Sequence, residues 1–306
     1  MKLDGIRRAL GTSGVAVARA VPDWSSRRLE DASIKPGHLV EGTHLEGIPV
    51  GQAESWPEPL AYLDGVQRSE IVGYVGTSPI IVAEIAAAVR ERRRRQLHTV
   101  VEERRHLAVG RPHALAAAAG ALGNLELVPL PDDEPVHPAR DLARAAQAVD
   151  QRRGALEIVV GHRYRDRSDG WLVVDGPLTE SPRWAADART VGVCRSHSVL
   201  PFIGADLDCY LRLPAGHRSS IYEPGTRSLA PVRAWALRLW PWEGQDLLHG
   251  LVRIEVAPTQ GLSESANRIS RWLMAERVPV TAPDRRWDCL LYGIHSVEQY
   301  LRTRAV

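Results

Sequence analysis

The stretch Trp171-Leu172-Val173-Val174-Asp175-Gly176-Pro177-Leu178 is an apolar run that ends in an acid, and a glycine follows at once. The same arrangement occurs earlier, in Leu60-Ala61-Tyr62-Leu63-Asp64-Gly65. Both runs have the length and the β-branched or aromatic content of buried strands. Each Asp is therefore predicted at the carboxyl end of its strand, where the glycine lets the backbone turn sharply. Two acids at the ends of two buried strands can converge and hold a divalent cation.

The composition narrows the classes of protein to consider. The chain has 306 residues, with 39 Lys plus Arg, 37 Asp plus Glu and a net charge of +2. This balance excludes a histone-like basic protein, so any contact with nucleic acid must come from a local patch. The three cysteines form no CxxC pair, which argues against a disulfide framework and for a reducing, cytoplasmic compartment. With no long apolar run in the sequence, we expect no membrane segment.

The pattern outside the two Asp-Gly runs predicts an α/β fold. Apolar runs with short turns favour an antiparallel meander of strands at 60–64, 69–75, 79–89 and 97–107, with 65–68 as the first turn. The run at 79–89 is also compatible with a buried helix. Residues 1–57 are interpreted as an N-terminal arm of uncertain structure, and 58–306 as the main domain.

Apolar residues at helical spacing predict a long helix at 139–163 that leads into the strand at 171–175. The remaining predicted elements are strands at 190–195, 206–213, 219–223, 232–239 and 250–257, and helices at 113–122, 263–276 and 289–304.

A set of carboxylates provides the candidate chemistry. Phosphodiester hydrolysis with two metal ions needs three or four acids around cations that lie roughly 3.5–4 Å apart. Asp64 and Asp175 supply the first pair, Glu157 in the long helix is the third, and Glu180 is a candidate fourth. His295 on the last helix is a candidate ligand or proton carrier. The alternatives are ordinary ones: Asp-Gly as a plain turn, Glu157 as a solvated helix residue, and His295 as a packing residue.

The most basic stretch runs from Arg90 to Arg105 and also carries Glu91, Glu102 and Glu103. Within it, Arg92, Arg93, Arg94 and Arg95 are candidate phosphate contacts for a nucleic acid. The alternative is a solvated edge of the sheet.

The order of these motifs resembles the NurA nuclease domain. The resemblance rests on the early Asp64-Gly65, on Leu172-Val173-Val174-Asp175-Gly176-Pro177-Leu178, on Val191-Gly192-Val193-Cys194-Arg195-Ser196, and on a tail that ends at His295. It implies a ribonuclease H-like mixed sheet, an antiparallel meander followed by parallel strands, flanked by helices and extended by C-terminal strands and helices. It also implies Mn²⁺- or Mg²⁺-dependent exonuclease and endonuclease action on DNA, a homodimer, and a hexameric HerA-type ATPase as partner, in DNA end processing or antiphage defence.

Carried over by position, the resemblance makes Asp64, Glu157 and Asp175 the metal ligands, with Glu180 and His295 in supporting roles. Two positions depart from the family pattern. Val66-Gln67 follows Asp64-Gly65 where the family has serine, and Arg195 stands where the family has lysine. Arginine can still bind a phosphate, but it cannot give up a proton.

Two other hypotheses stand beside the DNA nuclease, and the departures bear on the first. The first is a catalytically weak or inactive adaptor of the same fold that serves the ATPase. The second is a ribonuclease H-like enzyme that acts on RNA or on hybrids.

Overall fold

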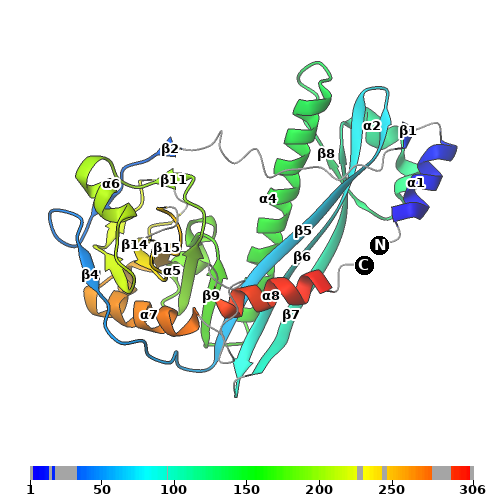
Figure 1. The fold of residues 1–306 in the computed structure, drawn as a ribbon. Coiled ribbons are helices and arrows are strands. Elements are labelled where there is room, and N and C mark those ends of the chain that lie inside the picture. The colour runs from blue at the N-terminus through cyan, green and yellow to red at the C-terminus, as the bar shows by residue number, and fades with distance from the viewer. Residues whose placement is uncertain are drawn as a thin grey trace.

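The computed structural model describes residues 3–13, 16–17, 33–94, 96–225, 230–242, 247–277 and 291–303. Over these residues the chain folds around one mixed sheet, in which thirteen strands take part (Figure 1). Its central strands are β5 (Leu60–Val75), β6 (Ser78–Arg93), β7 (Gln96–Gly110), β9 (Trp171–Asp175) and β10 (Thr190–Cys194).

The order of these strands confirms the predicted fold class. From one side to the other they lie β7, β6, β5, β9, β10. β5, β6 and β7 are antiparallel, whereas β9 pairs parallel to β5 and β10 parallel to β9. This is the ribonuclease H-like arrangement of a meander followed by parallel strands.

Further strands extend the sheet on both sides. Beyond β7 lies β8 (Glu126–Pro129), and beyond β10 lie β15 (Leu251–Val256), β14 (Arg233–Arg238), β13 (Tyr222–Glu223) and β3 (His38–Leu39).

The prediction of two strands with a turn at 65–68 is wrong, because β5 is a single strand of 16 residues. Its pairing with β6 continues from Leu60 opposite Arg92 to Val75 opposite Ser78, with one irregularity between Ile71 and Gly73. The chain reverses only after Val75, where Gly76 has a φ of 57° that glycine adopts without strain. The run at 79–89 belongs to β6, so the alternative of a buried helix is excluded there.

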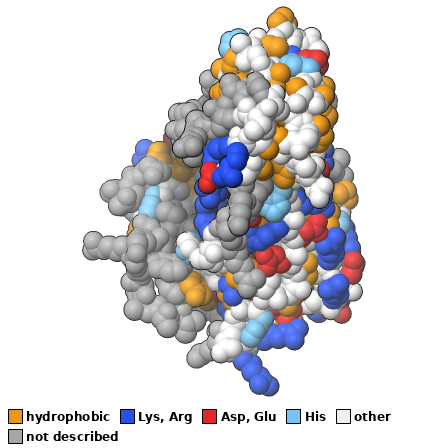
Figure 2. Space-filling model, turned by 90° about the vertical axis from the view of Figure 1, so that its right-hand side faces the viewer, with side chains coloured by type: hydrophobic (Ala, Val, Ile, Leu, Met, Phe, Trp, Pro, Cys, Tyr) orange, Lys and Arg blue, Asp and Glu red, His pale blue; other side chains and the backbone are white. Residues whose placement is uncertain are grey.

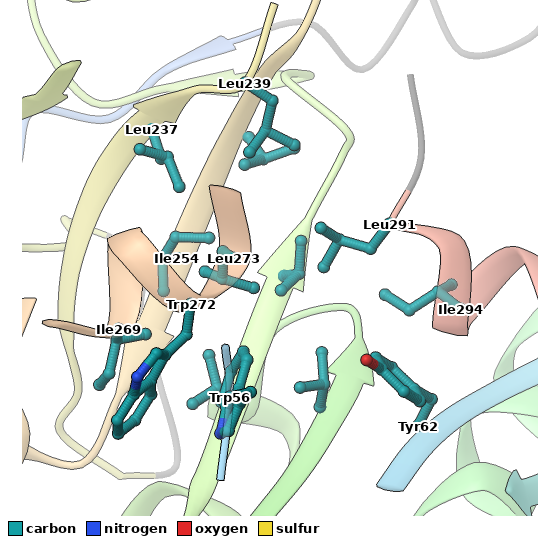
Figure 3. Close-up of a cluster of buried hydrophobic side chains, with 14 of the residues drawn as sticks. Trp56, Tyr62, Leu237, Leu239, Ile254, Ile269, Trp272, Leu273, Leu291 and Ile294 are labelled. Carbon is teal, nitrogen blue, oxygen red and sulfur yellow. The ribbon is translucent and has the colours of Figure 1, made fainter. Parts of the chain in front are cut away.

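Helices cover both faces of the central strands. On one face α4 (Pro138–Arg165) packs over Leu63, Leu172 and Val174. On the other face α7 (Ser263–Glu276) and α8 (Tyr292–Thr303) share a core with Tyr62 and Val173. Figure 3 shows this second core, in which Trp56 and Trp272 lie close together and Leu291 and Ile294 approach Tyr62. The alternation of side chains along β5 and β9 separates the two cores.

The long helix α4 confirms the prediction for 139–163. Pro138 occupies the first turn, where its missing N–H is not needed, and the His137 side chain accepts a hydrogen bond from the Arg140 amide. Its buried residues Ala145, Val149, Leu156 and Val160 recur at spacings of four or seven, which gives the helix one face toward the sheet.

The far end of the long hairpin carries its own small core. α1 (Leu3–Thr12), α2 (Pro112–Ala117) and α3 (Ala119–Leu122) surround it, and β1 (Ala16–Val17) pairs with β5. The helix predicted at 113–122 is thus two short helices. At the opposite end, β4 (Gly47–Pro49) pairs with β12 (His217–Ser219), and β2 (Ser33–Ile34) with β11 (Val199–Leu200). The arm boundary at 57 stays a prediction.

The strand predicted at 206–213 is wrong, because α6 (Gly204–Leu211) occupies that stretch. Its alternating pattern is too short to separate a strand from a helix. The buried Arg238 donates hydrogen bonds to the carbonyls of Leu211 and Leu213 at its end, and this long-range contact favours the helix. Of the described helices, none has the length and apolar character needed to cross a membrane.

Candidate functional site

Asp64 and Asp175 lie on neighbouring strands at the same level. β5 and β9 pair in parallel up to Leu63 opposite Val174, and the two acids are the next residue of each strand. Because Tyr62 and Val173 belong to the core under α7 and α8, alternation directs Asp64 and Asp175 to that same face. Asp175 ends β9 as predicted, but Asp64 lies inside β5, so the prediction that it ends a strand is wrong.

Glu157 lies on the opposite face of the sheet from the two acids and packs against Gly65, the residue after Asp64. A Cβ atom at Gly65 would overlap with Oε1 of Glu157 and would lie only 2.9 Å from its Cγ and Cδ. Gly65 is therefore required for the close approach of α4 to β5, and not for the sharp turn that the sequence suggested. The Gly65 amide also donates a hydrogen bond of 2.7 Å to Oδ1 of Asp64.

The negative charges of the three carboxylates affect the pKa values of Asp64 and Glu157. Burial, and then the charges of Asp175 and Glu157, raise the pKa of Asp64 well above its ordinary value. Burial raises the pKa of Glu157 to about 7, with a further contribution from Asp175 and opposition from Arg153. Only 4% of Asp64 and 7% of Glu157 is exposed. Such buried acids, whose pKa values are raised by one another, are typical of functional sites.

Two arginines partly balance this negative charge. Arg195, which follows β10, donates to Asp175 through both Nε, at 2.9 Å, and Nη2. Arg153, one turn before Glu157 on α4, donates to Glu157, to Asp150 at 2.8 Å and to Gln67 at 3.2 Å. Sequence reasoning missed Arg153, although its spacing of four residues from Glu157 is that of a helical ion pair.

Glu180 lies on the side of α4. It ends the short helix η2 (Leu178–Glu180), and its Oε2 would be 3.7 Å from a Cβ atom at Gly154. Burial raises the pKa of Glu180, which Arg153 opposes. The buried Glu255 of β15 accepts a hydrogen bond of 2.9 Å from the Leu178 amide and so fixes the turn between Asp175 and Glu180.

The last helix carries His295 and Glu298, and the charge of Glu298 acts on Arg195. α8 contacts both β5 and β9, and Nδ1 of His295 lies 3.9 Å from Oε2 of Glu298. Burial opposes the charge of Arg195, but the carboxylates of Asp175, Asp64 and Glu298 outweigh it and raise its pKa. Glu298 is a second residue that sequence reasoning did not select, and its position one turn after His295 is the pattern that points to it.

Two of the four candidate phosphate contacts at the β6–β7 turn, Arg92 and Arg93, form ion pairs. Arg92 pairs with Glu276 at 2.8 Å and with Glu58 at 3.2 Å, and Arg93 pairs with Glu91. Arg94 follows at the turn, and Arg95 lies outside the described residues. On the face that Figure 2 shows, basic and acidic side chains are interspersed over the lower part. A role of these arginines in binding nucleic acid stays a prediction.

The donor set fits a hard divalent cation, because it consists of carboxylate oxygens from β5, β9 and α4. Burial and mutual repulsion disfavour their ionised forms, and a bound cation would remove that penalty. As the side chains stand, the described residues contain no group of three or more acids, histidines or cysteines close enough together to hold a metal ion. Asp175 is paired with Arg195 and Glu157 with Arg153, and Glu157 lies on the other face of the sheet from the two aspartates.

Comparison with known proteins finds a distant similarity among solved structures. No family model and no curated protein matches the sequence. Among solved structures, the crystal structure of the NurA nuclease from Sulfolobus solfataricus is similar, with a TM-score of 0.48 and 10% sequence identity. The alignment covers 87% of this chain and 81% of that one.

Proposed function

We propose that this chain is a metal-dependent nuclease that cleaves DNA. The observation that carries the proposal is the placement of Asp64 and Asp175 side by side on β5 and β9, with their charges and that of Glu157 on α4 close enough to raise the pKa values of Asp64 and Glu157. A purely structural cluster would have its charges balanced, whereas here four acids, with Glu180, face two arginines. The resemblance of the sequence motifs to the NurA domain supports a nuclease over other metal-dependent enzymes.

In this proposal, Asp64, Asp175 and Glu157 hold Mn²⁺ or Mg²⁺. When bound, such ions supply an activated water and stabilise the charge that develops on the phosphate. The planar guanidinium of Arg195 presents the N–H groups of Nε and Nη2 side by side, so it can donate two parallel hydrogen bonds to two oxygens of one phosphate. Arg195 thereby orients the strand to be cut. Glu180 and His295 act in support, at the edges of the cluster.

The wider assignment follows the same resemblance. We propose that the protein is a homodimer, that it works with a HerA-type hexameric ATPase, and that it processes DNA ends in repair or antiphage defence.

The test is cleavage of end-labelled single- and double-stranded DNA with Mn²⁺, Mg²⁺ or EDTA, for the wild type, Asp175→Ala and the exposed control Asp208→Ala. We expect products that need metal and that are lost only in Asp175→Ala. Cleavage that survives Asp175→Ala would disprove the assignment of the site. Preference for RNA or hybrids over DNA would favour a ribonuclease H-like enzyme instead.

One observation favours a second candidate, the catalytically inactive adaptor for the ATPase. Asp175 and Glu157 are both already paired with arginines of the chain. An adaptor would bind the ATPase but give no products with any metal, with or without the ATPase in the same reaction. Products that appear only when the ATPase is added would support the nuclease and exclude the adaptor.

A further inference from the structure

The pair formed by Arg195 and Asp175 covers the more accessible part of the acidic cluster. The guanidinium donates to both oxygens of the carboxylate, so both are engaged. The Arg195 side chain is 36% exposed, and that of Asp175 only 13%. A ligand from solvent therefore reaches the arginine before it reaches the acid.

Arg195 is held more loosely than Arg153. Arg153 donates to three side chains, those of Glu157, Asp150 and Gln67, and is 25% exposed. Among the described residues, the hydrogen bonds of Arg195 go to Asp175 alone. Moving Arg195 breaks one ion pair, whereas moving Arg153 breaks two ion pairs and a hydrogen bond. Arg195 is thus the arginine that can move at the lower cost.

We infer that Arg195 acts as a latch that couples the binding of a nucleic-acid phosphate to the binding of a divalent cation. In the free protein the guanidinium of Arg195 is hydrogen-bonded to both carboxylate oxygens of Asp175. When a phosphate of the strand replaces Asp175 as the acceptor of the hydrogen bonds of Arg195, both oxygens of Asp175 become available to the cation. The inference rests on the proposed function, since it assigns the order of binding at that same site.

The coupling follows from charge and geometry. A phosphate offers two oxygens in the same arrangement as a carboxylate, so it can replace Asp175 on Arg195 without loss of the paired hydrogen bonds. The released carboxylate then lies beside buried Asp64, where two uncompensated charges are unfavourable until a cation binds. Phosphate and cation therefore favour each other, and by linkage each raises the affinity of the other by the same factor.

The experiment is a titration with Mn²⁺, followed by the electron paramagnetic resonance signal of the free ion. It is done without DNA and with a short single-stranded DNA whose phosphorothioate linkages resist hydrolysis. The proteins are the wild type, Arg195→Gln, Arg195→Lys and a control, Arg105→Gln. Arg105 matches Arg195 in exposure, at 39%, and likewise donates two hydrogen bonds to one carboxylate, that of Glu103. Titration of the DNA alone corrects for Mn²⁺ that the strand itself binds.

For the wild type and Arg105→Gln, we expect the DNA to lower the apparent Kd for Mn²⁺ by about fivefold or more, the usual lower range of coupling between sites. Arg195→Gln should bind Mn²⁺ without DNA at least as tightly as the wild type does with it, and DNA should have no further effect. Arg195→Lys, which keeps the charge but not the paired donors, should retain a smaller effect of DNA.

Two results would overturn the inference while leaving the proposed function intact. One is a Kd of the wild type that is the same with and without DNA. The other is an effect of DNA that persists in Arg195→Gln. If Arg195→Gln does not fold, as judged by circular dichroism, the two wild-type titrations and Arg195→Lys still decide. If no protein binds Mn²⁺ under any condition, the metal site itself is refuted, and the latch with it.

Discussion

The two ends of α4 each bury a carboxylate beside an arginine, and they differ in how completely the charges are balanced. At its start, Asp141 and Arg111 are each 1% exposed and joined by two hydrogen bonds of 2.9 and 3.0 Å. Arg111 also donates to Asp132 and to the carbonyls of Glu134 and Pro135, so every side of the pair is satisfied. Toward its end, Glu157 shares Arg153 with Asp150. The charges of Glu157, Asp64 and Asp175 also act on one another, and no further arginine is bonded to Asp64 among the described residues.

The difference teaches how buried charge divides between structure and function in this molecule. A buried pair whose donors and acceptors all have partners fixes the loop at 132–135 onto α4 and leaves nothing for a ligand. A buried group with more acids than arginines is less stable on its own and is completed by a cation from outside. The following predictions test this contrast, in order of decreasing effect.

Asp64→Asn should reduce DNA cleavage by about four orders of magnitude or more, the loss that follows removal of a central catalytic group. The folded protein should remain at least as stable as the wild type, because the buried charge that Asn removes is disfavoured by burial and by its neighbours. Cleavage rates and thermal unfolding measure the two effects, with the exposed Asp208→Asn as control. If Asp64→Asn cleaved DNA normally, the acids near the end of α4 would have no more functional role than the Asp141–Arg111 pair at its start.

Asp141→Asn should have the opposite profile. It removes the buried charged partner of Arg111 and leaves only Asp132, whose side chain is 52% exposed. The expected cost is about 3–5 kcal/mol in the free energy of unfolding. Urea denaturation measures the loss, and cleavage per folded molecule should stay at the level of the wild type. A strong loss of activity with unchanged stability would mean that this end of α4 also serves the site.

The pH dependence of stability should reveal the buried Glu157 of α4. The pKa of Glu157 is about 7 in the folded protein against an ordinary 4.5, so the folded state binds the proton more tightly than the unfolded chain does. The contribution of this group is therefore full below pH 4.5 and is lost as pH rises through about 7. The shift corresponds to about 3 kcal/mol.

Relative to Glu157→Gln, the wild type should lose about that much stability between pH 5 and pH 8, measured by urea denaturation at both pH values. Asp208→Asn, which alters an exposed acid, should show no such difference. Parallel pH profiles of the wild type and Glu157→Gln would show that Arg153 balances Glu157 as fully as Arg111 balances Asp141.

Gly65→Ala should lower stability less than Asp141→Asn does and should slow cleavage less than Asp64→Asn does. The added Cβ displaces the Glu157 carboxylate, which costs about 1–3 kcal/mol in stability. A displacement of this kind is expected to slow cleavage by about a hundredfold. Gly120→Ala is the control, because a Cβ atom there has open space around it. Normal cleavage by Gly65→Ala would show that the approach of Glu157 to β5 is not needed.

Many of the helices and strands could be predicted from the sequence, because their formation depends on the spacing of apolar residues close together in the chain. The apolar spacing along 139–163 and the prolines and polar residues before it predicted α4 to within a few residues. The apolar runs at 171–175 and 190–195 predicted β9 and β10 for the same reason. The helix at 206–211 was mistaken for a strand, since eight residues with a mixed pattern are compatible with either and the contact with Arg238 is distant in sequence.

The acids of the candidate site could also be identified from the sequence, by residue type and by motif. The arginines that pair with them, and the face of the sheet on which each acid lies, could not. Sequence determined that Asp64, Glu157 and Asp175 exist beside apolar runs and a glycine. Only the tertiary structure decided that Gly65 makes room for Glu157 in the middle of β5, and that Arg195 and Arg153 occupy the carboxylates. The physical reason is range: helix and strand patterns depend on neighbours a few residues away, whereas these contacts join residues that only the completed sheet and its helices bring together.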